Sequence, residues 1–384
     1  MRVLHLSKFY PPVRGGIESA TYELAEGLNR RGVSADVLCA NDMFASRAEV
    51  TDSGYMVLRS GSLGTLLSTS MSPMLAWHAR RMVQEYDVIH VHMPNPMAAL
   101  ALRLSPPAGR VVVHWHSDVI RQKLAQPLYK PLQDWLLDRA DAIVATTQPY
   151  VDASEPLQRW QHKVEVIPIG VSDHHARADA TAARRVRARY PGQRLIFSLG
   201  RMTYYKGFDV LVEAAALLPE DCTVLIGGSG RLMVALERQV RALGLQRRVH
   251  LLGQLTHEEL LATFAACDVF CLPSTARAEA FGIAMVEAMA MGKPVVSADI
   301  AGSGVPWINR HGESGLTVPV GDAGALAAGL RQVLDDPALC RQLGQGARRR
   351  YLQGFTAEHM VARTIELYRR LAAGRWSGRT RHGG

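Results

Sequence analysis

Two glutamates stand in the apolar segment 278–296, which reads AEAFGIAMVEAMAMGKPVV. Between Gly282 and Met291 only Glu287 can carry a charge, and a helix that is apolar on nearly every face is normally buried. An ionised and unpaired carboxylate inside a protein costs several kcal/mol. A cation, a set of hydrogen-bond donors or a ligand must therefore compensate the charge of Glu287.

The other acid, Glu279, lies in a predicted loop, and Gly282 opens the helix that follows it. We expect the backbone amides of Phe281, Gly282 and Ile283 to face outward at this helix N-terminus, where they favour negative charge. The two acids are predicted to lie roughly 12 Å apart, too far for carboxyl groups that share a proton. This spacing suits two acids that hold different hydroxyls of one extended ligand, such as a sugar nucleotide.

Two cations follow the predicted strand 194–200, which ends at Gly200. Arg201 and Lys206 stand in one loop directly before an amphipathic helix, so both charges and the helix dipole can converge on a single anion. A solvated loop with two exposed cations is the alternative. We favour the anion site, because the loop lies at the predicted carboxyl edge of a parallel sheet, where such folds bind ligands.

Glycines follow two of the predicted strands. Gly15 and Gly16 directly precede the first helix, where they permit close backbone approach and leave free amides; a plain tight turn is the alternative. The segment GGSGRL, 227–232, includes Gly228 and resembles half of a dinucleotide fingerprint. It lacks the third glycine and the acidic residue of that motif, which argues against a nicotinamide site.

Histidines flank a tryptophan at the end of the predicted strand 110–115. Strand alternation sends His114 and His116 to one face and Trp115 to the other. We expect one histidine to be structural and the last, His116, to point into the ligand cleft. A satisfied core histidine is the alternative reading of His116.

The sequence gives no support for a metal ion at a diphosphate. No Asp-x-Asp sequence occurs anywhere in the chain, and such carboxylates are the usual ligands of Mg²⁺. Asp173, His174 and His175 are adjacent but lack further ligands. We therefore expect no metal and no cofactor.

Short β-branched runs alternate with helical patterns along the whole chain. Their apolar character is typical of buried parallel strands. This alternation predicts an α/β protein with two doubly wound, Rossmann-like domains that face each other across a cleft. We place the N-terminal domain at 1–175, the C-terminal domain at 190–355, and a crossover helix with a basic tail at 356–384. The polar segment 173–193 is interpreted as a linker.

The 384 residues carry a formal net charge of +9, which is concentrated at the C-terminus. Residues 341–384 contain ten arginines and two glutamates, a net of +8. One interpretation is a solvated basic helix and tail; the other is attraction to anionic lipid, to which each basic residue adds about 1 kcal/mol. Nucleic acid is disfavoured, because no aromatic residues interleave the arginines.

Composition favours a cytoplasmic protein. No apolar stretch reaches the length of a membrane span, and the first residues lead into a strand pattern and not into a signal peptide. The five cysteines lack metal or redox spacing, so small buried thiols are expected.

Together, these motifs resemble the retaining glycosyltransferases of family four, which have the GT-B architecture. The resemblance covers nearly the whole chain, and the two glutamates eight positions apart in EAFGIAMVEAMAMGKPVV are its most specific part. The other residues that carry it are Gly15, Gly16, Glu18, His116, Arg201, Lys206 and the GGSG of 227–230.

The resemblance implies a role for each site residue. Arg201 and Lys206 would neutralise the donor diphosphate, and Glu287 would hold the ribose hydroxyls. Glu279 and the backbone of 281–283 would grip the transferred sugar, with His116 contacting the sugar or positioning the acceptor. The N-terminal domain would then bind the acceptor and the C-terminal domain the sugar nucleotide.

The segments HWHSDVIRQK, 114–123, and AGSGVPWIN, 301–309, are similar to a subgroup that adds mannose or D-rhamnose from GDP-sugars to lipid-linked O-antigen or related bacterial polysaccharides. GDP-mannose is therefore the leading donor and a lipid-linked or saccharide acceptor is expected. The alternatives are a UDP-sugar-dependent transferase, a GT-B epimerase or phosphorylase, and a non-catalytic nucleotide- or membrane-binding scaffold.

Overall fold

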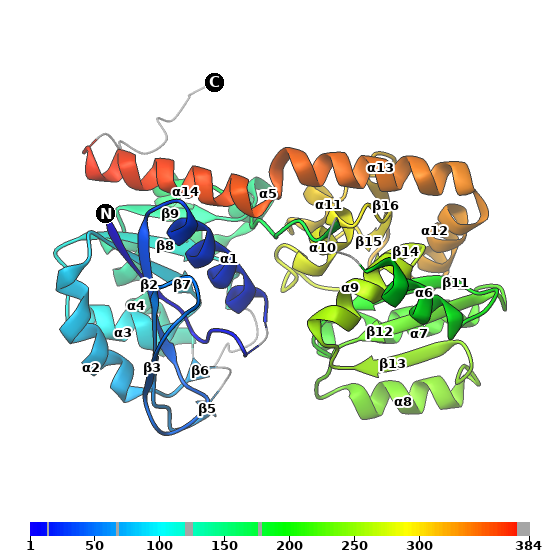
Figure 1. The fold of residues 1–384 in the computed structure, drawn as a ribbon, viewed down its shortest axis with the longest axis horizontal. Coiled ribbons are helices and arrows are strands. Elements are labelled where there is room, and N and C mark those ends of the chain that lie inside the picture. The colour runs from blue at the N-terminus through cyan, green and yellow to red at the C-terminus, as the bar shows by residue number, and fades with distance from the viewer. Residues whose placement is uncertain (14, 67–68, 120–125, 176–178, 375–384) are drawn as a thin grey trace. The chain divides into compact units, whose positions relative to one another are not determined.

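The computed structural model describes residues 1–13, 15–66, 69–119, 126–175 and 179–374. The chain divides into two compact units. Unit 1 comprises Met1–Gly170 and Ala357–Gly384, and unit 2 comprises Val171–Thr356. Figure 1 follows the chain through unit 1, then through unit 2, and back into unit 1 at helix α14 (Ala357–Ala372).

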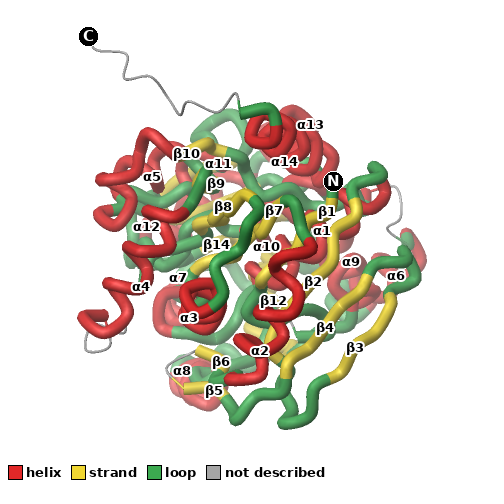
Figure 2. The backbone as a smooth tube through the Cα atoms, turned by 90° about the vertical axis from the view of Figure 1, so that its left-hand side faces the viewer, coloured by secondary structure: helices red, strands yellow, loops and turns green. Residues whose placement is uncertain are grey.

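Unit 1 is built on an eight-stranded sheet in the order β10-β9-β8-β7-β1-β2-β4-β3, which Figure 2 shows fanning across the unit. Strand β3 is antiparallel to β4, and the other neighbouring strands are parallel. The strands are β1 Arg2–Leu6, β2 Ser34–Ala40, β3 Arg47–Val50, β4 Met56–Ser60, β7 Val88–Met93, β8 Arg110–Trp115, β9 Ala142–Ala145 and β10 Val164–Val166, with a separate hairpin of β5 Thr65–Leu66 and β6 Thr69–Ser70.

Helices cover both faces of this sheet. Helices α1 and α14 pack so closely that a Cβ on Gly27 would lie 2.3 Å from Val361 Cγ2. Helices α2, α3 and α4 pack against one another in turn. The helices of unit 1 are α1 Gly16–Arg30, α2 Pro73–Met82, α3 Pro96–Leu104, α4 Gln126–Arg139, α5 Gln148–Ala153 and α14, with 3₁₀ turns at Val83–Glu85 and Glu155–Lys163.

Unit 2 has a six-stranded sheet in the order β13-β12-β11-β14-β15-β16, and its neighbouring strands are all parallel. The strands are β11 Arg194–Leu199, β12 Cys222–Gly227, β13 Val249–Gly253, β14 Val269–Leu272, β15 Val295–Ala298 and β16 Gly315–Val318. The helices are α6 Ala180–Ala188, α7 Phe208–Ala216, α8 Met233–Ala242, α9 His257–Ala266, α10 Ile283–Ala290, α11 Val305–Ile308, α12 Ala323–Asp335 and α13 Pro337–Gly354, with a 3₁₀ turn at Tyr204–Lys206.

The prediction of two Rossmann-like α/β domains is confirmed, because each unit has a parallel sheet wound with helices. The linker interpretation of 173–193 is wrong in part, since residues 180–188 form helix α6 of unit 2. Asp179 caps this helix by accepting a hydrogen bond from the Thr181 amide, and α6 packs along α9. Among the described residues, no helix combines the length and apolar character needed to cross a membrane.

Five buried histidines lie on one face of the unit 1 sheet, on three neighbouring strands. They are His5 on β1, His90 and His92 on β7, and His114 and His116 at the end of β8. The first row runs across the strands: His5 Nδ1 and His92 Nε2 lie 3.1 Å apart, and His92 Nδ1 and His116 Nε2 lie 3.0 Å apart.

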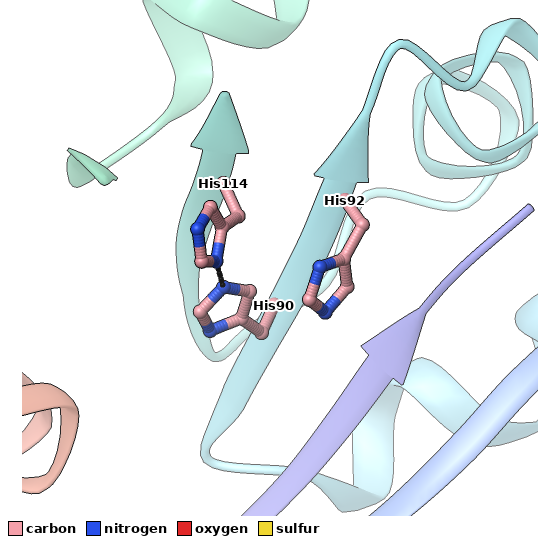
Figure 3. A group of neighbouring side chains, drawn as sticks. All are labelled: His90, His92 and His114. Carbon is pink, nitrogen blue, oxygen red and sulfur yellow. Dashed lines mark hydrogen bonds between the residues drawn. The ribbon is translucent and has the colours of Figure 1, made fainter. Parts of the chain in front are cut away.

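The second row contains His90 and His114, which lie two residues before His92 and His116 on the same strands. The Tyr368 hydroxyl of α14 contacts His90 Nδ1, and His90 Nε2 lies 3.3 Å from His114 Nδ1. Figure 3 shows this His90–His114 contact edge to edge, with His92 beside it on the same strand.

Burial lowers the pKa of all five histidines, because the charged ring is poorly solvated inside the protein. The pKa falls to about 3 for His5 and for His114. The rows are therefore neutral at pH 7.

These pKa values predict acid sensitivity. An unfolded histidine titrates near 6.5, so between pH 6.5 and about 3 the unfolded chain binds protons that the folded chain does not. Stability should be highest above pH 6.5 and fall as the pH decreases through this window. His5→Asn removes one such group and should flatten the slope by about 1.4 kcal/mol per pH unit in urea unfolding titrations.

The control for this comparison is His162→Asn, because His162 is exposed in the same unit. The slope of this variant should stay steeper than that of His5→Asn. If the unfolding free energy of the wild type and of His5→Asn changed equally with pH, His5 would not be a buried neutral histidine.

The loops after β11 and β12, at the carboxyl edge of the unit 2 sheet, contact each other at Gly200 and Gly228. Gly228 follows β12 with φ +116°, and a Cβ there would lie 2.0 Å from the Gly200 carbonyl oxygen. Since the neighbour is backbone, it cannot swing away, and the loops after β11 and β12 depend on the absence of a side chain.

We expect Gly228→Ala to lower the free energy of unfolding by at least about 2 kcal/mol more than Gly244→Ala. Gly244 also has a positive φ, +69°, but a Cβ there meets nothing within 4 Å, so it isolates the cost of backbone strain, about 1 kcal/mol. Urea unfolding of both variants makes the comparison, and similar losses would show that the loop contact does not matter.

Candidate active site

The polar centre of unit 2 is a buried ion pair between loops at the carboxyl edge of its sheet. Lys206, in the 3₁₀ turn after β11, donates from Nζ to Glu279 Oε2 at 2.6 Å. The side chains are 12% and 8% exposed, so both charges are largely removed from water. Ser274 Oγ also donates to Glu279 Oε2, at 2.7 Å. Both bonds end on Oε2, and Oε1 is the oxygen that neither bond uses.

The pKa of Lys206 reflects two opposing effects. Burial is the largest single effect and lowers it, but the Glu279 carboxylate and Tyr205 together outweigh burial, and the net result is a raised pKa. Lys206 is therefore a permanent cation at neutral pH. The positive charge of Arg201 also acts on Lys206 and lowers its pKa, which places the two predicted cations within electrostatic reach of each other. The side chain of Arg201 is exposed.

Three loops hold Glu279 in place. The Thr275 amide donates to the Tyr205 carbonyl at 2.7 Å, which ties the loop after β14 to the Lys206 turn. Ser303 Oγ donates to the Glu279 carbonyl, and the Gly304 amide donates to the Ala280 carbonyl at 2.9 Å. The segment 301–309, left without a role by its sequence, therefore fixes the backbone of the acid.

Helix α10 starts next to this pair. Gly282 is its N-cap with φ +83°, which favours glycine, and no side chain caps the helix. The amides of the first turn thus have no capping side chain, which leaves them suited to an anion. Phe281 is buried, whereas Ile283 is half-buried.

Glu287 lies on α10 and is only half-buried, so the helix is less enclosed than its sequence predicts. Its side chain lines a small cavity, about 20 Å³, with His174, His257 and residues of α9. That volume holds about one water molecule and no ribose. The proposed binding of ribose hydroxyls by Glu287 therefore stays a prediction. The ribose would have to contact Glu287 outside this cavity.

The predicted glycines have different local roles. A Cβ on Gly200 would lie 2.9 Å from Lys206 Cε, so Gly200 makes room for the buried lysine. In unit 1, helix α1 begins at Gly16, and a Cβ on Gly15 would lie 2.2 Å from Glu18 Oε2. The Glu18 carboxylate thus lies against the turn where close backbone approach was expected.

In unit 1, His116 is buried and ends the first histidine row. As predicted, His114 and His116 share a face: their rings stack with centroids 4.2 Å apart. Trp115 points elsewhere and donates from Nε1 to Asp118 Oδ1. The sequence offered a signal for the whole row, since His90 and His92 also alternate on one strand, but this signal was not recognised.

Ring nitrogens of His90, His92 and His114 all lie within 4.8 Å of one another, close enough to suggest a metal group (Figure 3). In a zinc site the lone pairs converge on the ion at 2.0–2.1 Å. Here His90 Nε2 and His114 Nδ1 face each other in a hydrogen bond. A metal ion would have to break this bond, so the present arrangement is a hydrogen-bonded row.

Comparison with known families agrees with this architecture. Residues 179–350 match the family described as glycosyl transferases group 1, and residues 15–170 match the glycosyl transferase 4-like domain.

Curated relatives extend over nearly the whole chain. The O-antigen chain mannosyltransferase C of Escherichia coli is 33% identical and covers 96% of this chain and 98% of its own. The D-rhamnosyltransferase WbpZ of Pseudomonas aeruginosa is 36% identical and covers 93% of both chains.

Solved structures share the fold. Sucrose-phosphate synthase from Thermosynechococcus elongatus matches with a TM-score of 0.81 and 25% identity over 97% of this chain and 99% of that one. Anabaena HepE in complex with UDP-glucose matches with a TM-score of 0.80 and 21% identity over 97% and 100%. The chain belongs to the family-four glycosyltransferases, enzymes with the GT-B architecture of two Rossmann-like domains.

Proposed function

We propose that the chain transfers a hexose, with mannose from GDP-mannose as the leading choice, to a lipid-linked or saccharide acceptor in cell-surface polysaccharide synthesis. The 33% and 36% identical relatives, a mannosyltransferase and a rhamnosyltransferase, support this substrate class. A UDP-sugar is the second candidate, which the UDP-glucose complex of the HepE neighbour favours.

The buried Lys206–Glu279 pair carries the proposal. When the bond between sugar and phosphate breaks, negative charge develops on the leaving nucleoside diphosphate. Fixed donors that face this charge stabilise the transition state without having to reorganise. Lys206, Arg201 and the first-turn amides of α10 supply two cations and a helix N-terminus for this purpose.

We infer that Glu279 has two tasks. It keeps Lys206 protonated and oriented through Oε2, and it offers Oε1 to a hydroxyl of the transferred sugar. We further propose that the reaction retains anomeric configuration and needs no metal, with the leaving phosphate accepting the acceptor's proton. In this mechanism no side chain acts as a general base.

The test is release of nucleoside diphosphate from a panel of GDP-mannose, GDP-rhamnose, UDP-glucose and UDP-N-acetylglucosamine. GDP-mannose should be the preferred donor. Arg201→Ala and Lys206→Ala should each lower kcat about 10²–10³-fold, the usual effect of removing one donor to a developing charge.

Arg241→Ala is the matched control, because Arg241 is an exposed arginine at the far end of α8. It should leave turnover unchanged. Since Lys206 is part of a buried pair, its variant must also be checked by thermal unfolding. Full activity of a folded Lys206→Ala protein would refute the proposed role of Lys206. Turnover of UDP-sugars alone would show that the donor is a UDP-sugar and not GDP-mannose.

We also propose that the enzyme contacts anionic membrane surfaces. The basic C-terminal segment supports this, and so does helix α2, where Met74 and Trp77 are 40% and 44% exposed next to Arg80 and Arg81. Exposed tryptophan and basic residues together are typical of interfacial helices.

Sedimentation with vesicles tests this contact. The chain should bind vesicles that contain phosphatidylglycerol and should not bind neutral phosphatidylcholine vesicles. Truncation after Gly374 removes three arginines and should weaken binding by about 1 kcal/mol for each. Equal binding to neutral vesicles, or none to anionic ones, would refute the electrostatic contact.

A further inference from the structure

The first histidine row, His5–His92–His116, has the geometry of a chain of hydrogen bonds and not of a stack. The ring centroids are 5.3 Å apart at both steps, whereas the bonded nitrogens are only 3.1 and 3.0 Å apart. The rings therefore meet edge to edge. Neighbouring strands lie about 4.8 Å apart, so one imidazole from each strand nearly matches the spacing that such a chain needs.

The sheet register makes the row diagonal. His5 is the Cα partner of His90, and His92 is the Cα partner of His114. Each bonded ring is thus two residues further along its strand than the Cα partner of its neighbour. The row climbs toward the carboxyl ends of the strands and finishes at His116, just beyond β8. Ligands of parallel α/β sheets bind at that edge.

Neutral imidazoles restrict the direction of the bonds. Each neutral ring has one N–H donor and one bare acceptor nitrogen. His92, in the middle, must therefore donate to one neighbour and accept from the other. Both bonds in the row point the same way, either from His5 to His116 or from His116 to His5.

The two directions differ at the ends of the row. Within the part of the chain that the structure describes, His5 Nε2 and His116 Nδ1 are buried without a hydrogen-bond partner. If the bonds point toward His5, an N–H is left at His5 Nε2, which is fully buried in the sheet. If they point toward His116, the N–H is at His116 Nδ1, at the ligand edge.

Buried N–H groups without a partner are rarer than acceptors without one. The direction toward His116 avoids a permanently unpaired N–H at His5. It also places the remaining N–H at His116, at the carboxyl edge of the sheet where parallel α/β folds bind ligands.

We propose that His5 and His92 are positioning residues that set the tautomer of His116, so that its Nδ1–H donates a hydrogen bond to a substrate oxygen. The donor role of His116 rests on the proposed transferase function, whereas the tautomer follows from the row itself. Burial keeps the pKa of all three rings low, so His116 is a neutral donor. All three rings should be Nδ1–H tautomers.

Two-bond ¹H–¹⁵N correlation spectra of the full chain at pH 7.5 measure this directly, because they distinguish protonated from bare ring nitrogens. We expect protonated Nδ1 and bare Nε2 at His5, His92 and His116. Protonated Nε2 at His116 would overturn the proposal. The spectrum is recorded without substrate. Its result therefore does not depend on whether a sugar-nucleotide substrate has been found.

Variants at His92 test the effect on function. His92→Phe removes the donor to His116 Nε2, so His116 should lose its fixed tautomer and kcat/KM should fall about 10-fold, the scale of a supporting hydrogen bond. His92→Asn places an amide near the former Nδ1 and should restore both the tautomer and most of the activity.

His90→Phe is the matched control, since His90 is equally buried on the same strand but belongs to the second row. It should leave the His116 tautomer unchanged. If His92→Phe keeps the tautomer, or if His92→Asn fails to rescue while remaining folded, His92 is merely structural. Correct tautomers in a chain that turns over none of the donors would sink the proposed function and leave the tautomer assignment intact.

Discussion

The buried contact between Lys206 and Glu279 constrains the rest of unit 2. Two charges removed from water are tolerated only when they are close together and further hydrogen-bonded, because either charge alone would be strongly destabilising. This requirement explains why Ser274 also binds the carboxylate and why the 301–309 segment holds the Glu279 backbone. It also explains the lack of a side chain at Gly200, where a Cβ would press on the lysine. The ion pair and the loops around it therefore depend on one another.

Unit 1 solves the problem of buried polar groups in the opposite way. Its histidines are neutral and hydrogen-bond to one another along rows across the strands, although His5 Nε2, His114 Nε2 and His116 Nδ1 have no hydrogen-bond partner among the described residues. Fixed charges suit a ligand whose charge changes during the reaction. The two units thus differ in electrostatics: unit 2 buries a charged pair at the carboxyl edge of its sheet, whereas unit 1 buries neutral rings.

Much of the architecture follows from local sequence, because β-branched runs and glycines act over a few residues. The parallel strands and the position of Glu279 in a loop were predicted for this reason. The direct Lys206–Glu279 bond was not, since it joins loops 73 residues apart and depends on the pairing of β11 with β14. The histidine rows likewise require the order β1-β7-β8. Helix α6 was missed because its sequence is polar and none of its residues is fully buried, so it has no long apolar run to recognise.

Helix α14 has a consequence for synthesis of the protein. Leu367, Tyr368 and Leu371 are buried in unit 1, although they are translated after all of unit 2. While the ribosome is still reading the second half of the message, the first sheet lacks the helix that covers it, and His90 lacks the Tyr368 hydroxyl. Unit 1 therefore cannot complete its fold until α14 has been synthesised. Until then its uncovered apolar surface is accessible to chaperones.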